Sequence, residues 1–146
     1  MDGRTHDFQV NDLIGKPFRD MGRGPDCFDC FGLVMEVFRR QGIELPDYGA
    51  GIWADQSARI DRAICDASDQ WTALSRPVRG CLIALRFPYP TWVSHLGVML
   101  DGERFINVRL KTKVVIDRIS SPAWRRRIAG FYKYRSQETE SRIQNG

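Results

Sequence analysis

The chain has 146 residues, of which 42% are hydrophobic and 27% are charged. This length fits one compact domain that buries roughly 68–70% of the surface of its unfolded chain, and the composition excludes a fibrous or largely disordered protein. The net charge of +4 favours anionic partners only mildly. The basic run at 125–127 is too short to indicate a nucleic-acid partner, so none is expected.

The N-terminal segment lacks the marks of a signal peptide, because it carries acidic residues where such a leader carries basic ones. No run of about 18 consecutive apolar residues occurs, so we expect no membrane span. The four cysteines, at positions 27, 30, 65 and 81, are too few and too irregularly spaced for a disulfide framework. We therefore expect a protein made in the cytoplasm with free thiols.

The first predicted element is a helix over 31–41, where apolar residues recur at helical spacing. Gly42 supplies a stop signal, and Cys30 is expected in the first turn. Asp29 is the expected N-cap, and Asp26 is the alternative if the helix begins earlier. A second helix is expected over 54–67.

After Gly80 the pattern changes to short apolar runs separated by turn residues, which is typical of strands. The expected strands are Cys81–Phe87, Ser94–Leu100, Arg104–Leu110, Val114–Ile119 and Ala129–Tyr134. A short helix is expected over Trp124–Arg127, because Ser121 and Pro122 form a typical helix start.

Helices followed by an antiparallel sheet predict an α+β fold in which the helical half covers one face of the sheet. We expect a single domain over 1–134. Residues 135–146 are polar and lack periodicity, so they are expected to form a mobile tail. In such a fold, a cysteine in the first turn of the helix can meet a polar residue of the sheet.

Cys30 is the first candidate for chemistry. The unpaired N–H groups and positive dipole of a helix N-terminus favour thiolate over thiol, so its pKa is expected to fall below that of an ordinary cysteine. A nucleophilic cysteine also needs a base, and the chain has only two histidines. His6 lies in the N-terminal segment, so His95, at the start of a predicted strand, is the candidate base.

The turn between two predicted strands supplies a third candidate. If 101–103 form a three-residue hairpin loop, His95 and Asn107 become diagonal neighbours on one face of the sheet. The Asn107 oxygen would then accept a hydrogen bond from one imidazole nitrogen while the other faces Cys30. A two-residue loop would place His95 and Asn107 on opposite faces.

Other interpretations of these residues stay open at this point. A cysteine in an apolar helix is often a packing residue, and a single strand histidine is often structural. Cys27 and Cys30 have the C-x-x-C spacing of zinc and redox sites. Neither a second pair of metal ligands nor the strand–helix context of a redox motif accompanies them, so we expect no metal and no cofactor.

The stretch GKPFRDMGRGPDCFDCFG, followed by LVMEVFRRQGIELP, resembles the opening of the NlpC-type cysteine peptidases, a papain-like family that acts on bacterial cell walls. The later HLGVMLDGERFIN resembles the strand–turn–strand of the same family. The resemblance extends over about 13–134. It implies a papain-like α+β fold with Cys30 as the nucleophile at a helix N-terminus, His95 as the base and Asn107 as the residue that orients it.

Within this family the chain is similar to the branch found in tails of phages and phage-like particles, because the aromatic Phe31 follows the nucleophile and the stretch SPAWRRRIAGFYKY at 121–134 resembles the ending of that branch. The resemblance implies a cysteine peptidase, a hydrolase that cleaves peptidoglycan stem peptides. It also implies a place in a virion tail or phage-like particle, with other tail proteins as partners and synthesis in the bacterial cytoplasm.

Three residues depart from the family pattern. Phe18 stands where a tyrosine is common, Asn107 replaces the usual histidine, and Cys81 stands where an aspartate usually follows the glycine. The first two motivate one alternative, a non-catalytic structural tail-tip or assembly protein that retains the fold. A papain-like amidase or acyltransferase is the other alternative.

Overall fold

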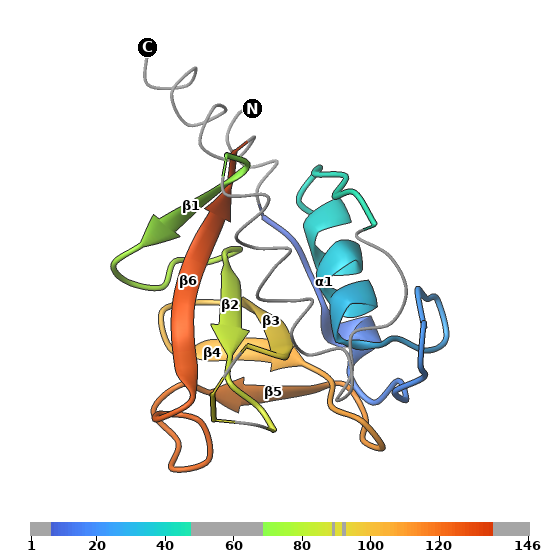
Figure 1. Cartoon of the computed structure of the whole chain (residues 1–146). Coiled ribbons are helices and arrows are strands. Elements are labelled where there is room, and N and C mark those ends of the chain that lie inside the picture. Colours follow the sequence, from blue (N-terminus) through green and yellow to red (C-terminus); the bar gives the residue numbers. More distant parts are fainter. Residues whose placement is uncertain (1–6, 48–68, 89, 92, 136–146) are drawn as a thin grey trace.

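The computed structural model describes residues 7–47, 69–88, 90–91 and 93–135. In this part of the chain one α-helix packs on a six-stranded antiparallel sheet (Figure 1). A 3-10 helix, Asn11–Leu13, precedes both. The expected helix over 54–67 and residues 136–146 of the expected tail lie outside the described residues.

Helix α1 spans Cys30–Arg39, close to its predicted range. Its N-cap is Asp29, as predicted, whose side chain accepts a hydrogen bond from the Gly32 N–H at 2.7 Å. After the helix the chain turns at Gly42, whose φ of 83° is a left-handed conformation that favours glycine. Within the described residues, no helix is long and apolar enough to cross a membrane.

The sheet contains β1 (Trp71–Leu74), β2 (Leu82–Leu85), β3 (His95–Met99), β4 (Arg104–Asn107), β5 (Val115–Arg118) and β6 (Ile128–Tyr134). Their order is β1-β6-β2-β3-β4-β5, and all neighbours are antiparallel. The five predicted strands are confirmed: four are shorter than predicted, and β6 begins one residue earlier. Strand β1 was not predicted, because its four residues show no alternation; it forms by pairing with β6.

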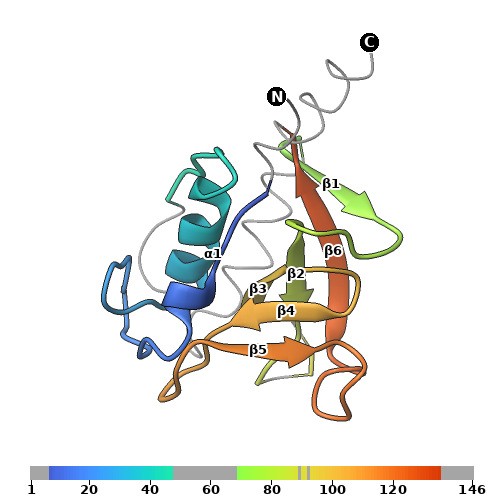
Figure 2. The same ribbon diagram turned by 180° about the vertical axis from the view of Figure 1, so that it is seen from behind.

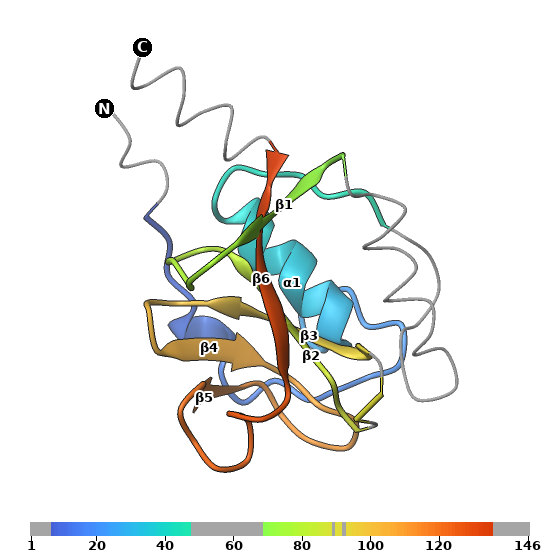
Figure 3. The same cartoon turned by 60° about the vertical axis from the view of Figure 1, so that its left-hand side comes forward.

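Each face of the sheet carries its own core. Figures 1 and 2 show α1 lying along one face of the sheet. There its apolar side packs against Leu96, Val98 and Ile106. We call the buried residues on this face the outer core. This confirms the predicted packing of helix on sheet. The opposite face carries the inner core, whose buried residues are Cys81, Ile83, Leu85, Met99, Phe105 and Trp124. Figure 3 shows how strongly the sheet twists, with β6 running across the direction of β4 and β5.

The segment that closes the inner core is not a helix, so the prediction for Trp124–Arg127 was wrong. The chain makes successive turns here, in which the N–H groups of Trp124 and Arg125 both donate to the Ser121 carbonyl, at 3.0 and 2.9 Å. Trp124 is buried, and its ring meets Phe105 edge-on with 5.6 Å between centroids. Because the Trp124 indole is buried among these residues, the 121–127 segment stays packed over the inner core.

The β3–β4 hairpin has the predicted three-residue loop. Met99 pairs with Phe105, and the Leu100 N–H donates to the Arg104 carbonyl at 2.8 Å. The Asp101 carboxylate stabilises the loop by accepting from the N–H groups of Glu103 and Arg104 at 2.8 and 2.7 Å. This register decides which side chains of the two strands share a face.

Candidate active site

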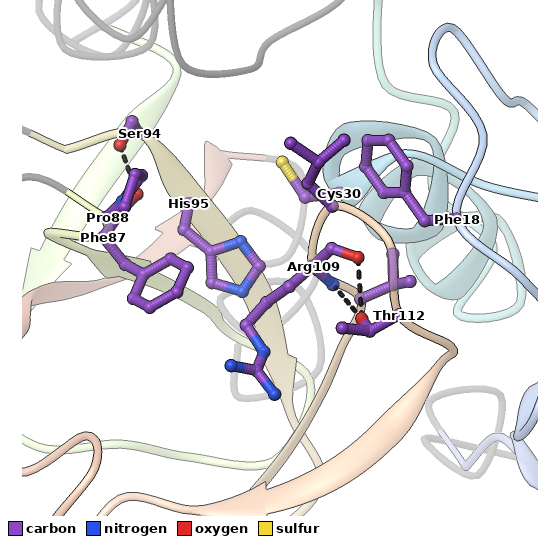
Figure 4. Close-up of a pocket in the computed structure, with 10 residues that line it drawn as sticks. Phe18, Cys30, Phe87, Pro88, Ser94, His95, Arg109 and Thr112 are labelled. Atoms are coloured by element: carbon purple, nitrogen blue, oxygen red, sulfur yellow. Dashed lines mark hydrogen bonds between the residues drawn. The ribbon is translucent and has the colours of Figure 1, made fainter.

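Cys30 and His95 line the same cavity, of about 260 Å³, where the N-terminus of α1 meets the start of β3. Figure 4 shows the sulfur of Cys30 on the side that faces His95. The N–H groups of Leu96 and Phe31 both act on the thiol and lower its pKa. Because Leu96 directly follows His95, the sulfur lies against the beginning of β3. We call this space the Cys30–His95 cavity.

Burial dominates the ionisation of Cys30. It raises the pKa of the thiol to about 12, and the adjacent Asp29 carboxylate acts in the same direction. The N–H groups of Leu96 and Phe31 and the charge of Arg23 oppose this rise and are outweighed. The expectation of a pKa below the ordinary value was therefore wrong, because burial and a neighbouring carboxylate outweigh the helix N-terminus.

The side-chain amide of Asn107 forms a hydrogen bond with His95. The imidazole Nε2 lies 2.8 Å from Oδ1 of Asn107, and Nδ2 of Asn107 donates to Asp117 at 2.9 Å. Since Asp117 accepts from the amide nitrogen, the amide oxygen faces the imidazole, which must donate from Nε2. In neutral His95 the other nitrogen, Nδ1, is then the basic one. The predicted diagonal contact between His95 and Asn107 is present.

The imidazole is neutral in the resting protein. Burial lowers the pKa of His95 to about 4, and the charge of Arg109 acts in the same direction. The hydrogen bond that Nε2 of His95 donates to Asn107 and the charge of Asp117 oppose this shift. Cys30 and His95 therefore rest as thiol and imidazole, not as an ion pair.

Aromatic rings fix the plane of the imidazole. Trp124 stacks on His95 with 5.5 Å between centroids and an interplanar angle of 13°. Phe87 approaches His95 at 5.8 Å and Trp124 at 5.3 Å. Together with Asn107, these rings leave the imidazole little freedom to rotate away from the cavity.

The loop before α1 is fastened to the helix N-terminus. Asp29 is fully buried, and its Oδ1 accepts from the Gly32 N–H and from Arg23, the latter at 2.8 Å. Arg23 also binds Asp47 at 2.9 Å, so one guanidinium joins three parts of the chain. The position of Cys30 thus depends on this buried ion pair as well as on α1.

The remaining residues singled out by the sequence lie apart from this arrangement or at its edge. Phe18 lines the Cys30–His95 cavity, so an aromatic ring without a hydroxyl stands there. Cys27 is half-buried and does not line this cavity, and Cys81 is buried in the inner core. Cys65 lies outside the described residues. Among the residues that the structure describes, no group of three or more His, Cys, Asp or Glu side chains is placed to hold a metal ion.

Sequence reasoning missed three residues of the site, Asp117, Trp124 and Arg109. Asp117 could have been found from the sequence, because it is an acidic residue within a predicted apolar strand. In the structure it pairs with Phe105, which places it diagonal to Asn107. No sequence signal pointed to Trp124, because its contact with His95 depends on how the 121–127 turn folds over the sheet. Arg109 follows β4 and lines the Cys30–His95 cavity.

A family model described as the NlpC/P60 family matches residues 15–133. The protein named "Probable endopeptidase p60" of Listeria grayi is 27% identical over 118 residues, which cover 81% of this chain and 20% of the relative. "Gamma-DL-glutamyl hydrolase" of Bacillus subtilis strain 168 is 29% identical over 128 residues, covering 86% of this chain and 28% of the relative. The chain therefore spans only 20% to 28% of the length of these relatives.

A solved structure from Staphylococcus aureus subsp. aureus Mu50 has the same architecture. It is described as similar to a lipoprotein of the NLP/P60 family, and it superposes with a TM-score of 0.64 at 25% sequence identity. The match covers 91% of this chain and 42% of the other. The α+β, papain-like arrangement predicted from the sequence is thereby confirmed.

Proposed function

The chain belongs to the NlpC/P60 family, and we propose that it is a cysteine-type hydrolase that cleaves peptide bonds in the stem peptides of bacterial peptidoglycan. The observation that carries this proposal is the shared cavity of Cys30 and His95, with His95 oriented by Asn107. The names of two relatives, an endopeptidase and a γ-glutamyl hydrolase, support the same class of reaction.

The neutral resting pair leads to a concerted first step. The sulfur of Cys30 attacks the amide carbonyl carbon while Nδ1 of His95 accepts the thiol proton. The protonated His95 then donates that proton to the leaving nitrogen, the C–N bond breaks, and a thioester to Cys30 remains. Water attacks the thioester with His95 as base, which releases the acid and restores the thiol.

The oxyanion of the tetrahedral intermediate needs donors at the entrance of α1. The backbone N–H of Cys30, at the first position of the helix, is our candidate, since it carries the partial positive charge of a helix end. Phe18 contributes no hydroxyl to this region. Backbone N–H groups therefore supply the larger share of the oxyanion stabilisation in this site.

Digestion of purified peptidoglycan tests the proposal. The wild type and Cys27→Ala are expected to release new free amino groups and shortened muropeptides, whereas Cys30→Ala releases neither. Cys27→Ala is the matched control, because Cys27 lies three residues away and outside the Cys30–His95 cavity. Release of the same products by Cys30→Ala, or by none of the three proteins, would contradict the assignment.

We further propose that the protein acts as a component of a phage or phage-like tail and binds other tail proteins. The support is the resemblance of the stretch SPAWRRRIAGFYKY, at 121–134, to that branch of the family. Mass spectrometry of purified particles tests this: the protein is expected to co-purify with tails in constant ratio to the tail proteins. Its absence from such particles would remove the proposal and leave the peptidase assignment intact.

A non-catalytic tail component is the second candidate function. Two observations favour it, the high pKa of the Cys30 thiol and the absence of a hydroxyl at Phe18. It predicts particle association without cleavage of peptidoglycan by any variant. Acyl transfer, the third candidate, would be revealed if added amines captured the acyl group and formed new amides in place of free acids.

A further inference from the structure

Arg109 places a positive charge at the edge of the Cys30–His95 cavity. It follows β4 and lines the cavity (Figure 4), and its charge lowers the pKa of His95. Its guanidinium carbon lies 5.7 Å from the centroid of Phe87 and 5.8 Å from that of Trp124. The guanidinium is therefore held against the same rings that position the imidazole.

The backbone around Arg109 is fixed. Its N–H donates to Oγ1 of Thr112 at 3.0 Å, and that hydroxyl donates back to the Arg109 carbonyl at 2.7 Å. These two hydrogen bonds with Thr112 fix the backbone from which the Arg109 side chain projects. The side chain is thus presented to the cavity by a defined turn that follows β4.

Within the described part of the chain, the Arg109 guanidinium has no anionic partner. Nε of Arg109 is buried without any hydrogen-bond partner, and no carboxylate of the described residues forms an ion pair with this side chain. Arg23, whose charge also acts on the Cys30 thiol, by contrast binds both Asp29 and Asp47. A buried donor without a partner is costly, and a planar guanidinium binds carboxylates especially well.

We propose that Arg109 is a specificity-determining residue of this cavity and binds a free carboxylate of the substrate close to the bond that Cys30 attacks. This inference rests on the proposed peptidase function and names a feature of its substrate. A peptide bond between α-linked residues with uncharged side chains in mid-chain offers no such carboxylate. The preferred substrate is therefore a peptide with a free carboxylate on a residue that flanks the scissile bond.

Two positions of the substrate can provide that carboxylate. On the acyl side, a γ-linked glutamyl residue keeps its α-carboxylate free, since its side-chain carboxyl forms the amide. On the amine side, the residue that supplies the leaving nitrogen keeps its own carboxylate when it ends the peptide. Both have the same chemistry, and the experiment below separates them.

The probe is the peptide L-alanyl-γ-D-glutamyl-L-lysine, made with both carboxylates free, with the glutamyl carboxylate as its amide, or with the lysyl carboxylate as its amide. Binding is measured by calorimetry on Cys30→Ala, which cannot turn the probe over. Converting the recognised carboxylate to an amide is expected to weaken binding about tenfold or more. In Cys30→Ala with Arg109→Gln this difference disappears, while Arg109→Lys restores part of it.

Arg127→Gln in the Cys30→Ala background is the matched control. The Arg127 guanidinium also lies over Phe87, at 5.2 Å, but Arg127 does not line the cavity, so this variant should keep the full preference for the acid. Equal binding of all three probe forms, a preference that survives Arg109→Gln, or failure of the probe to bind would each overturn the inference. Because the readout is binding, these results are distinct from a failure to cleave peptidoglycan.

Discussion

Asn107 forms one hydrogen bond to His95 and one to Asp117, so it links the imidazole to a carboxylate. The amide oxygen lies 2.8 Å from the imidazole, and the amide nitrogen donates to Asp117 at 2.9 Å. An amide has no charge with which to orient a histidine, and it can rotate so that either end faces the ring. The carboxylate behind it removes this ambiguity. Asp117 therefore supplies the negative charge that Asn107 lacks.

Replacing Asp117 by Asn tests this positioning role. The new side chain can donate as well as accept, so Asn107 is no longer forced to present its oxygen, and Nδ1 of His95 loses its unique basic form. We expect kcat to fall about 10- to 100-fold with little change in KM. Nitrogen chemical shifts of His95 should report a mixture of tautomers. A single unchanged tautomer with lowered kcat would contradict the role.

The buried imidazole also makes stability depend on pH. The pKa of His95 is lowered from 6.5 to about 4, so between these values the unfolded chain binds a proton that the folded chain does not. The unfolding free energy must then fall as the pH falls through this window, by up to about 3 kcal/mol. Above the upper value this contribution is constant.

The variant His95→Gln isolates that effect. Its unfolding free energy should fall less between pH 7 and pH 4.5 than that of the wild type, since all other titrating groups are common to both proteins. Urea denaturation at several pH values measures the difference. A difference between the two proteins that stays constant across this range would show that His95 is not held neutral by burial.

At the scale of elements, α1 is in direct backbone contact with the loop before it, which carries Gly22 and Arg23. A Cβ built on Gly32 would lie 1.9 Å from the carbonyl oxygen of Gly22, so no side chain fits there. The same loop carries Arg23, which pairs with the buried Asp29. The first turn of α1, and with it Cys30, is therefore placed by packing against the loop.

Gly32→Ala should separate the loop from the helix. We expect a loss of about 2–3 kcal/mol of unfolding free energy and a loss of activity, because Cys30 moves with the first turn. Gly102→Ala is the matched control: a Cβ at Gly102, in the β3–β4 loop, would meet nothing within 4 Å, so its effect should stay within about 0.5 kcal/mol. Equal stability of the two variants in urea would refute the packing argument.

The elements differ in how far the sequence could predict them, for physical reasons. Asp29, the apolar spacing and Gly42 are local signals, and they define α1 almost to the residue. The loop over 101–103 is also local, so the register that brings His95 beside Asn107 was predictable. Strand β1 depends on pairing with β6, some 60 residues away, and the turn at 121–127 depends on burial of Trp124. Neither has a local signal.

The site shows the same division. Cys30, His95 and Asn107 could be named from local pattern and resemblance, and the structure brings the first two to one cavity. Their ionisation could not be predicted, because it depends on burial by residues distant in sequence. Trp124 enters the site through the turn at 121–127, and Arg109 through the turn that follows β4.

At the scale of the molecule, the Cys30–His95 cavity lies where the two cores meet. Cys30 belongs to the helix of the outer core, whereas His95 stacks on Trp124 of the inner core. Correct geometry therefore requires both faces of the sheet to be packed. Damage to the inner core should affect catalysis only where it reaches the imidazole.

Trp124→Phe and Ile83→Val separate these two effects. Both change the inner core, and Ile83→Val should cost about 0.5–1.5 kcal/mol while leaving kcat unchanged, because Ile83 supports the sheet away from the Cys30–His95 cavity. Trp124→Phe removes the larger ring that stacks on His95, so kcat should fall about 2- to 10-fold, the equivalent of one aromatic contact. Rates are compared where circular dichroism shows both variants fully folded. If kcat fell equally in both, the site would depend on general stability of the inner core, and Trp124 would have no specific part in holding the imidazole.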